Sequence, residues 1–234
     1  MSSNQPSPIV EVDGATKVYQ QGRVEVHALR GLDLQVQAGE LTALYGPSGS
    51  GKTTLLNLIG ALDRPTTGRI RIEGQDLGDL SRRELSQLRR DRIGFVFQAY
   101  NLIPVLTAFE NAEAVMALQG VDAGVRRQRI EGVFAEMGLE GLEDRRPDEL
   151  SGGQQQRVAI ARAIAADPAV VLADEPTANV DSETADRLLG IMEALNRQHG
   201  VTFIFSTHDP RVMARARRLV RIVDGRVDGD EKRE

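Results

Sequence analysis

The sequence predicts a single α/β domain whose central sheet is mainly parallel. From residue 41 onward, short apolar runs at 41–45, 94–97, 170–173 and 201–205 alternate with longer segments of helical character. Runs that are apolar on both faces suit parallel strands covered by helices on both sides. Alternation of strands and helices is typical of α/β proteins. The 234 residues are enough for one such domain with a sizeable core.

Two segments depart from this alternation. Residues 8–37 carry short runs of Val, Ile and Leu that are broken by turn residues, which predicts an antiparallel β layer. Residues 99–167 are mostly helical in pattern, so we expect an inserted helical subdomain there. For the whole chain we expect a flexible N-terminus over 1–8, one domain over 9–227 and a charged tail over 228–234.

Composition and charge limit the class of function. The formal net charge of −5 argues against a protein that binds nucleic acid mainly through phosphate contacts. The sequence has no cysteine, so it has no disulfide framework and no cysteine-rich metal site. No run approaches the ~18 apolar residues of a membrane-spanning helix, and the polar start lacks the features of a signal peptide. We therefore expect a soluble protein, with any membrane part supplied by another polypeptide.

Residues 46–53, Gly-Pro-Ser-Gly-Ser-Gly-Lys-Thr, match the phosphate-binding pattern G-x-x-x-x-G-K-[ST] in full. The pattern follows the expected strand at 41–45 and opens an expected helix over 52–62. Its glycines allow backbone N–H groups to face phosphate oxygens, and the helix N-terminus adds partial positive charge. Lys52 suits the β- and γ-phosphates, and the Thr53 hydroxyl suits Mg²⁺. The alternative is an ordinary glycine- and serine-rich turn. The predicted nucleotide-binding residues are Gly46, Pro47, Ser48, Gly49, Ser50, Gly51, Lys52, Thr53 and Thr54.

Polar residues follow the carboxyl ends of three expected strands: Gln98, the pair Asp174 and Glu175, and His208. In doubly wound sheets, ligands bind at this edge, so we expect these side chains to face the phosphates. Asp174 is predicted to hold Mg²⁺ through its water shell. Glu175 is predicted to be the general base for the attacking water. His208 is predicted to orient the γ-phosphate or the water, and Gln98 to contact both Mg²⁺ and water. The alternative for each is a structural polar residue at a strand end.

The run 150–157, Leu-Ser-Gly-Gly-Gln-Gln-Gln-Arg, predicts a second anion site. Ser151 is a candidate N-cap for a helix over 154–166, and Gly152 and Gly153 expose backbone amides at its positive end. A second cradle in one chain is redundant, so we predict a dimer with a two-fold axis. Each chain would lay its 151–153 amides on the γ-phosphate bound by the other. Two ATP molecules would then close the dimer, and hydrolysis would release it. The alternative is a flexible helix start.

Together these motifs resemble those of ABC ATPases, and the resemblance covers nearly the whole chain. It implies a P-loop NTPase core with an antiparallel β subdomain and an inserted helical subdomain, and it implies ATP and Mg²⁺ as cofactors. It adds Tyr19 as the aromatic residue that stacks on adenine, and Gln154 and Asp181 as further nucleotide-binding residues. In family terms the segments are Walker A (46–53), the Q-loop (Gln98), the signature (150–154), Walker B (170–175), the D-loop (178–181) and the switch histidine (His208). The catalytic set is then Glu175, His208, Gln98 and Lys52, and the metal set Thr53, Gln98 and Asp174.

The runs 46–57, 101–111 and 151–157 resemble the subgroup that serves lipoprotein release, macrolide export and FtsE-type cell division (LolD/MacB/FtsE-like). Ala178 stands where this subgroup usually has glycine. The resemblance implies an ATPase at the cytoplasmic face of the membrane that drives a permease subunit with a large extracytoplasmic domain. A groove at about 99–115 would receive the coupling helix of that partner. Its apolar residues are Leu102, Ile103, Val105, Leu106 and Phe109, for some of which core packing is the alternative.

Two other functions stay open at this point. A soluble ABC ATPase acting on nucleic acid or ribosomes typically has two cassettes or a long coiled-coil insertion, and this chain has neither. A regulatory ATPase of cell division would use the same ATP cycle and a membrane partner, so the sequence does not separate it from a transporter.

Overall fold

The computed structural model describes residues 7–233 and contains a six-stranded sheet with the strand order β10-β9-β3-β8-β7-β6. All neighbouring strands in it are parallel except β9 and β10. The predicted α/β fold with a mainly parallel sheet is therefore confirmed. The strands are β3 (Leu41–Tyr45), β6 (Ile93–Val96), β7 (Val170–Asp174), β8 (Phe203–Ser206), β9 (Arg218–Val223) and β10 (Arg226–Lys232).

A second, antiparallel sheet covers one side of the molecule and has the order β2-β1-β4-β5. Its first two strands, β1 (Val10–Gln21) and β2 (Val24–Val36), occupy the segment in which the sequence predicts a β layer. The other two, β4 (Thr67–Ile72) and β5 (Gln75–Asp76), come from a segment in which the sequence analysis places no strand. β4 joins the sheet through its antiparallel pairing with β1.

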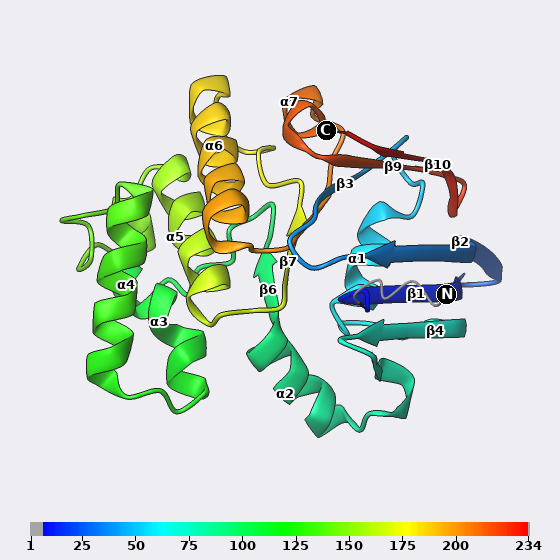
Figure 1. Cartoon of the computed structure of the whole chain (residues 1–234), viewed down its shortest axis with the longest axis horizontal. Helices are drawn as coiled ribbons and strands as arrows, with labels where there is room; N and C mark the ends of the chain where they lie inside the picture. Colours follow the sequence, from blue (N-terminus) through cyan, green and yellow to red (C-terminus); the bar gives the residue numbers. More distant parts are fainter. Residues whose placement is uncertain (1–6, 234) are drawn as a thin grey trace, which may run out of the picture.

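The helical segment, which contains α3 (Ala108–Leu118), α4 (Ala123–Met137) and α5 (Gly152–Ala165), lies at the opposite end of the molecule from the antiparallel sheet (Figure 1). Two of its helices begin with reciprocal caps, Thr107 with Glu110 in α3 and Ser151 with Gln154 in α5. The α-helices are α1 (Lys52–Ile59), α2 (Arg82–Arg92), α3 (Ala108–Leu118), α4 (Ala123–Met137), α5 (Gly152–Ala165), α6 (Ser182–His199) and α7 (Pro210–Arg215). Short 3₁₀ turns form at Leu77–Asp79 (η1) and Pro147–Glu149 (η2).

The five parallel strands of this sheet are buried on both faces because they send side chains into two different cores, whereas β10 at the edge is largely exposed. In β8, Phe203 and Phe205 pack in the cluster shared with the helices of the helical segment and α6, whereas Ile204 packs in the cluster shared with α1 and the antiparallel sheet. This two-sided burial explains why the strands appear in the sequence as continuous apolar runs. It also fixes the carboxyl ends of these strands at one rigid edge.

Some boundaries differ from those expected. The helix expected over 52–62 ends at Ile59, and Ala61 adopts a left-handed conformation with φ 53°. Most of the expected charged tail is ordered, since residues 228–232 belong to β10 and pair with β9. The flexible N-terminus expected over 1–8 lies mostly outside the described residues. Among residues 7–233, no helix combines the length and the apolarity that a membrane span requires.

Candidate functional site

The loop between β3 and α1 is tightly packed against its neighbours. Gly46 has φ 145° and Gly51 has φ 104°, a region that side chains rarely adopt. A Cβ at Gly46 would overlap the carbonyl oxygen of Ile222 in β9, and one at Gly51 would lie 2.5 Å from the carbonyl oxygen of Ala28 in β2. These two glycines are therefore required by close approach of the backbone as well as by φ.

The Lys52 side chain places a positive charge within this loop. Its side chain is 8% exposed, and its Nζ donates to the carbonyl oxygens of Gly46 and Pro47, both at 2.9 Å. Within residues 7–233 it forms no ion pair with a carboxylate. An ammonium group that is held only by carbonyls, beside a helix N-terminus, favours an anionic ligand.

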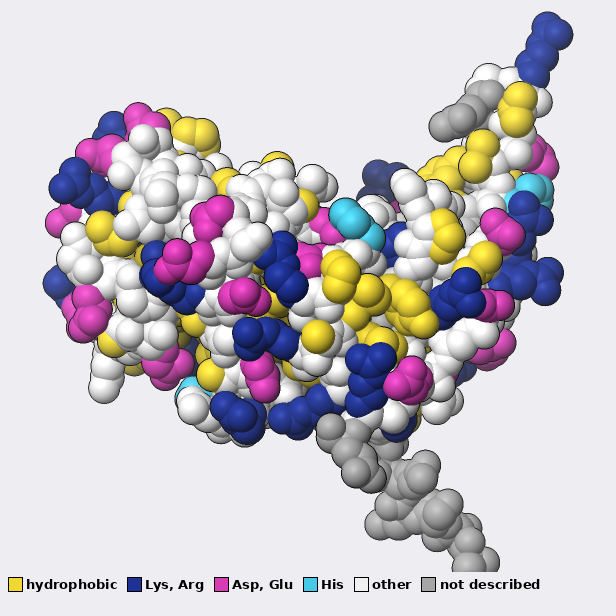
Figure 2. All heavy atoms as spheres, turned by 90° about the horizontal axis from the view of Figure 1, so that it is seen from above, with side chains coloured by type: hydrophobic (Ala, Val, Ile, Leu, Met, Phe, Trp, Pro, Cys, Tyr) yellow, Lys and Arg dark blue, Asp and Glu magenta, His cyan; other side chains and the backbone are white. Residues whose placement is uncertain are grey.

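An open pocket of about 650 Å³ joins the loop to the carboxyl edge of the sheet. The residues lining it are Val26, His27, Ala28, Gly46–Thr54, Gln98, Glu175, Ala178, Ser206 and His208. The space-filling view shows the outline hollowed between the helical lobe and the lobe of β1 and β2 (Figure 2). Of the polar residues predicted to face the phosphates, the pocket thus brings together the loop, Gln98, Glu175 and His208.

Of the predicted metal residues, Thr53 and Gln98 line this pocket, whereas Asp174 does not and lies next to Thr53. The Thr53 hydroxyl donates to Asp174 Oδ1 at 3.1 Å, which places two hard oxygen ligands side by side. Mg²⁺ suits such a set because it keeps several waters and takes few protein ligands. The buried hydroxyls of Ser50 and Ser206 have no hydrogen-bond partner within the described residues, and both line the pocket. In residues 7–233 there is no cluster of three His, Cys, Asp or Glu that would suit a metal held by protein ligands alone.

Glu175 and His208 are in direct contact. His208 Nδ1 lies 2.7 Å from Glu175 Oε1, and the buried Thr207 hydroxyl lies 3.4 Å from Glu175 Oε2. When the Glu175 carboxylate is ionised it only accepts hydrogen bonds, and His208 Nδ1 is then the donor in this contact. Glu175 itself has φ 47°, a left-handed conformation that a residue with a side chain adopts only under constraint. The first residue after β7 is therefore held in an unusual backbone conformation inside the pocket.

The signature segment does not reach this pocket in one chain. Ser151 caps α5 as predicted, since its Oγ accepts from the Gln154 backbone N–H at 3.3 Å. Gly152 lies against Tyr100, and a Cβ at Gly153 would overlap the Thr184 side chain of α6. None of 151–154 is among the residues that line the pocket.

Asp181 also lies outside the pocket. It caps α6 by accepting from the backbone N–H of Thr184 at 3.0 Å, and from the Thr184 hydroxyl. The Thr184 hydroxyl and amide hold the pKa of Asp181 below its ordinary value. Within one chain, the signature residues and Asp181 are thus explained as helix caps and packing contacts.

Tyr19 lies beside the pocket rather than in its lining. Its hydroxyl donates to Asp63 Oδ2 at 3.0 Å, and Lys17 Nζ lies 4.9 Å from the centre of its ring. Burial, with the hydrogen bond to Asp63, raises the pKa of Tyr19. In the sheet Tyr19 pairs with Val26, which does line the pocket. Its predicted stacking on adenine stays a prediction.

Sequence reasoning missed a set of contacts around Gln98. The Asn179 side chain donates to the Gln98 carbonyl oxygen at 2.8 Å, and the Tyr100 hydroxyl donates to the Asn179 carbonyl oxygen at 3.0 Å. The Arg162 guanidinium donates to the carbonyl oxygens of Tyr100 and Asn101, which both have positive φ. Asn179 lies within the run 178–181 that resembles the D-loop, but nothing in the sequence indicates its contact with Gln98. The sequence carries no signal for Tyr100 and Arg162, because their contacts depend on the fold.

The chain is similar in sequence to known proteins. Residues 29–178 match the family described as ABC transporter. The chain is 49% identical to a "Lipoprotein-releasing system ATP-binding protein LolD" of Anaeromyxobacter dehalogenans, over 97% of this chain and 96% of the relative. It is 47% identical to a "Macrolide export ATP-binding/permease protein MacB" of Syntrophobacter fumaroxidans, over 94% of this chain but only 31% of that longer protein.

A solved structure of known fold is also similar to this chain. The ATP-binding cassette MJ0796, a protein of Methanocaldococcus jannaschii, has been solved as a dimer in a post-hydrolysis state bound to ADP and Pi. It superposes with a TM-score of 0.89 at 41% identity, covering 96% of this chain and 99% of that chain.

Proposed function

The chain belongs to the ABC transporter family of ATP-hydrolysing proteins, and on that premise we propose that it powers a separate membrane partner through ATP-driven closure of a homodimer. The observation that carries the proposal is the pocket in which the phosphate-binding loop, Gln98, Glu175 and His208 meet, while the signature segment lies elsewhere. The relatives described above are transporter ATP-binding proteins, which supports this function over a soluble ATPase acting on nucleic acid or ribosomes.

In the proposed mechanism the loop binds the phosphates of ATP. The backbone amides of 46–53 and the α1 N-terminus face the phosphate oxygens, and Lys52 exchanges its carbonyl contacts for the β- and γ-phosphates. Thr53, Gln98 and Asp174 would hold Mg²⁺, which when bound would supply positive charge against the negative charge of the phosphates. These residues orient the terminal phosphate toward the carboxyl edge of the sheet.

Glu175 is proposed to accept the proton of the attacking water. Its Oε1 contacts His208 Nδ1 and its Oε2 contacts Thr207, so the carboxylate is oriented by two neighbours from the loop after β8. His208 keeps its Nε2 for the γ-phosphate or the water. Because one carboxylate oxygen can accept the water proton while the other remains hydrogen-bonded, the pair can act as one unit.

The second half of each site is proposed to come from another copy of the chain. Gly152 and Gly153 occupy the first turn of α5, where backbone N–H groups have no partner within the helix. Laid against the γ-phosphate of the partner, these amides and Ser151 would complete the site, with Asp181 at the same interface. The dimeric arrangement of MJ0796 supports this assembly.

A surface groove is proposed to receive the membrane partner. A pocket of about 310 Å³ lies between α2, β6, α3 and α5, and its apolar lining includes Phe95, Phe97 and the exposed Leu118. Of the range 99–115 expected to form it, only Asn101 and Val115 line the pocket. Its other lining residues are Leu62, Arg89, Arg90, Ile93, Gly94, Arg162, Ala163 and Ala166.

The five apolar side chains expected at this groove differ in burial. Val105 is 74% exposed and Ile103 is also exposed, whereas Leu102 and Phe109 pack against the core. Leu106 is half-buried. Core packing, the alternative interpretation, therefore applies to Leu102 and Phe109.

The charges of this groove indicate the chemistry of its occupant. Arg89 donates to the carbonyl oxygen of Ala61, and Arg162 donates only to carbonyls. Neither has a carboxylate within 4.0 Å among residues 7–233. Desolvation lowers the pKa of Arg162, yet a guanidinium stays charged at neutral pH. The groove thus suits a helix with an apolar face and a carboxylate. We assign this helix to a permease subunit with an extracytoplasmic domain, on the resemblance to the LolD and MacB proteins. The chain would act on the cytoplasmic face of the membrane.

Two measurements test the proposal. In Glu175→Gln, Mg-ATP should still bind, turnover should fall ~10²–10⁴-fold, and light scattering should show a dimer. Ser151→Phe, combined with Glu175→Gln, should retain ATP binding and remain monomeric. Turnover of Glu175→Gln at the wild-type rate would refute the role of Glu175 as general base. A normal dimer of the variant that also carries Ser151→Phe would refute the proposal that two copies share each ATP site.

The partner is tested by photo-crosslinking in native membranes with ATP. A photoreactive residue at Leu118, in the groove, is compared with one at Val125, which is also an exposed apolar residue but does not line it. Crosslinks from 118 alone to a membrane protein with a large extracytoplasmic domain would support the proposal. A permease with many helices would overturn the subgroup, and ribosomal or DNA-bound products would overturn the membrane partner.

A further inference from the structure

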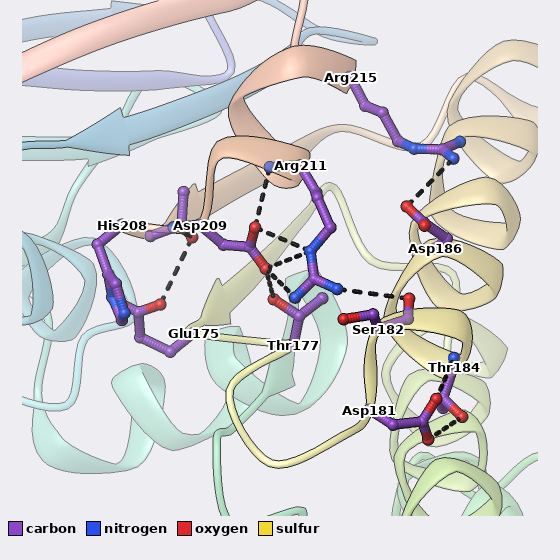
Figure 3. A network of polar contacts seen from close by, with 11 residues as sticks. Glu175, Thr177, Asp181, Ser182, Thr184, Asp186, His208, Asp209, Arg211 and Arg215 are labelled. Atoms are coloured by element: carbon purple, nitrogen blue, oxygen red, sulfur yellow. Dashed lines mark hydrogen bonds and ion pairs between the residues drawn. The ribbon is translucent and has the colours of Figure 1, made fainter.

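A ring of contacts joins the loop after β7 to the loop after β8 (Figure 3). The Thr177 hydroxyl donates to Asp209 Oδ2 at 2.9 Å. The Asp209 backbone N–H donates to Thr207 Oγ1 at 2.9 Å, and the Thr207 hydroxyl lies 3.4 Å from Glu175 Oε2. One residue separates Glu175 from Thr177, and one separates Thr207 from Asp209. Backbone and hydrogen bonds therefore close a ring that contains the proposed base.

Asp209 is the charged member of this ring and is firmly held. Its Oδ1 accepts from the Arg211 backbone N–H at 2.9 Å and from Arg211 Nε at 3.0 Å, and its Oδ2 accepts from Arg211 Nη2 at 2.8 Å. The Asp209 side chain is 13% exposed, and Thr177 is 3% exposed. Because the contacts are largely removed from water, each one constrains the position of its partners strongly.

The ring includes the backbone of Glu175, whose conformation must be held by its surroundings. Glu175 has φ 47°, and a strained conformation of this kind persists only where the surroundings impose it. The backbone N–H of Glu175 donates to the Ser206 carbonyl oxygen at 2.9 Å, which fixes one side of the residue. The contact between Thr177 and Asp209 fixes the chain two residues later. His208 lies between the ring members Thr207 and Asp209, so its backbone is fixed as well.

We propose that Thr177 and Asp209 are positioning residues for ATP hydrolysis, which hold Glu175 and His208 in the relative placement that the reaction needs. The inference rests on the proposed role of Glu175 as general base. Neither Thr177 nor Asp209 lines the pocket, so both act through the two residues that do. Arg211 Nη1 also lies 3.4 Å from the Ser182 carbonyl oxygen, at the start of α6. The loop from 176 to 181 is therefore held at both of its ends.

A simpler role for Asp209 is to cap α7, since it accepts from the Arg211 backbone N–H. That role does not involve Thr177, which lies in a different segment. The hydroxyl of Thr177 therefore separates the two roles: a cap does not depend on it, whereas the positioning ring does.

The test compares two variants of the full chain in a steady-state ATPase assay with varied ATP. Thr177→Val keeps the shape of the side chain and removes the hydroxyl, whereas Thr177→Ser keeps the hydroxyl. We expect Thr177→Val to lower kcat about tenfold, equivalent to ~1.4 kcal/mol, with KM within about twofold of the wild-type value. We expect Thr177→Ser to retain kcat within about threefold.

Equal losses in both variants, or a wild-type kcat for Thr177→Val, would overturn the inference. If Thr177→Val fails to fold, Asp209→Ser provides the second measurement, because serine still caps α7 but is too short to contact Thr177. Its kcat should fall with KM unchanged, and a wild-type kcat would overturn the inference. Glu175→Gln is measured alongside. If it retains turnover, the proposed function fails too; if it loses turnover while Thr177→Val does not, only the positioning role fails.

Discussion

Asp209 makes the stability of the protein depend on pH in a predictable direction. Hydrogen bonds from Arg211 lower its pKa from 3.8 to about 2, against the opposing effect of burial. Because one pKa unit is worth ~1.4 kcal/mol, this fall corresponds to ~2.5 kcal/mol. Solvent screening of the partly exposed Arg211 reduces the contribution to ~1–2 kcal/mol. We expect Asp209→Asn, which cannot ionise, to lose this amount at pH 7.

The sign follows from proton linkage. The folded protein binds the Asp209 proton less readily than the unfolded chain, so the stabilisation is complete above the ordinary pKa near 4. It is lost as the pH falls from about 4 to about 2. The difference in unfolding free energy between wild type and Asp209→Asn should therefore be constant from pH 7 to 5 and fall by roughly half near pH 3.

Urea denaturation of both proteins at pH 7, 5, 4 and 3 measures this difference. Asp148→Asn, at an exposed position, controls for the loss of one negative charge. A difference that stays constant down to pH 3, or that grows, would refute the assigned environment of Asp209.

Three other predictions concern the loop and the helical segment. Lys52→Ala should weaken ATP binding by about 10²-fold or more, since it removes charge-assisted contacts worth ~1.5–3 kcal/mol each, as measured by equilibrium binding; binding within a few-fold of wild type would contradict the proposed cradle. Gly46→Ala should abolish binding because its Cβ would overlap the Ile222 carbonyl, whereas Gly49→Ala, with no neighbour within 4 Å, should cost only backbone strain; similar affinities for the two would contradict the packing argument. Phe134→Ala should lower the unfolding free energy by ~3–5 kcal/mol, because Phe134 is 0% exposed; a loss under ~1 kcal/mol in urea denaturation would contradict its place in the core.

Much of the site can be predicted from the sequence because its parts are local. The phosphate-binding loop is one contiguous run, and the cap of α5 lies within four residues of the chain. The meeting of Gln98, Glu175 and His208 follows from one rule, that parallel strands end at a common edge. The sequence therefore predicts which residues gather there, once the strands are recognised.

The parts that could not be predicted depend on contacts between distant segments. β4 alternates polar and apolar residues over only 69–72, which is short for a strand signal, and its main pairing is with β1, more than fifty residues earlier. The contact of Thr177 with Asp209 requires the register of β7 against β8. The groove is composed of side chains from four elements, so a single range of the chain did not describe it.

The packing of Gly153 on Thr184 has an evolutionary consequence. A Cβ at 153 would overlap the Thr184 side chain, which belongs to another helix of the same chain. This position is therefore constrained by the fold before any nucleotide is bound. A lineage could admit alanine or serine at 153 only if the residue at 184 became smaller at the same time. We expect the two positions to change together among homologues, as compensating partners in an interface between α5 and α6.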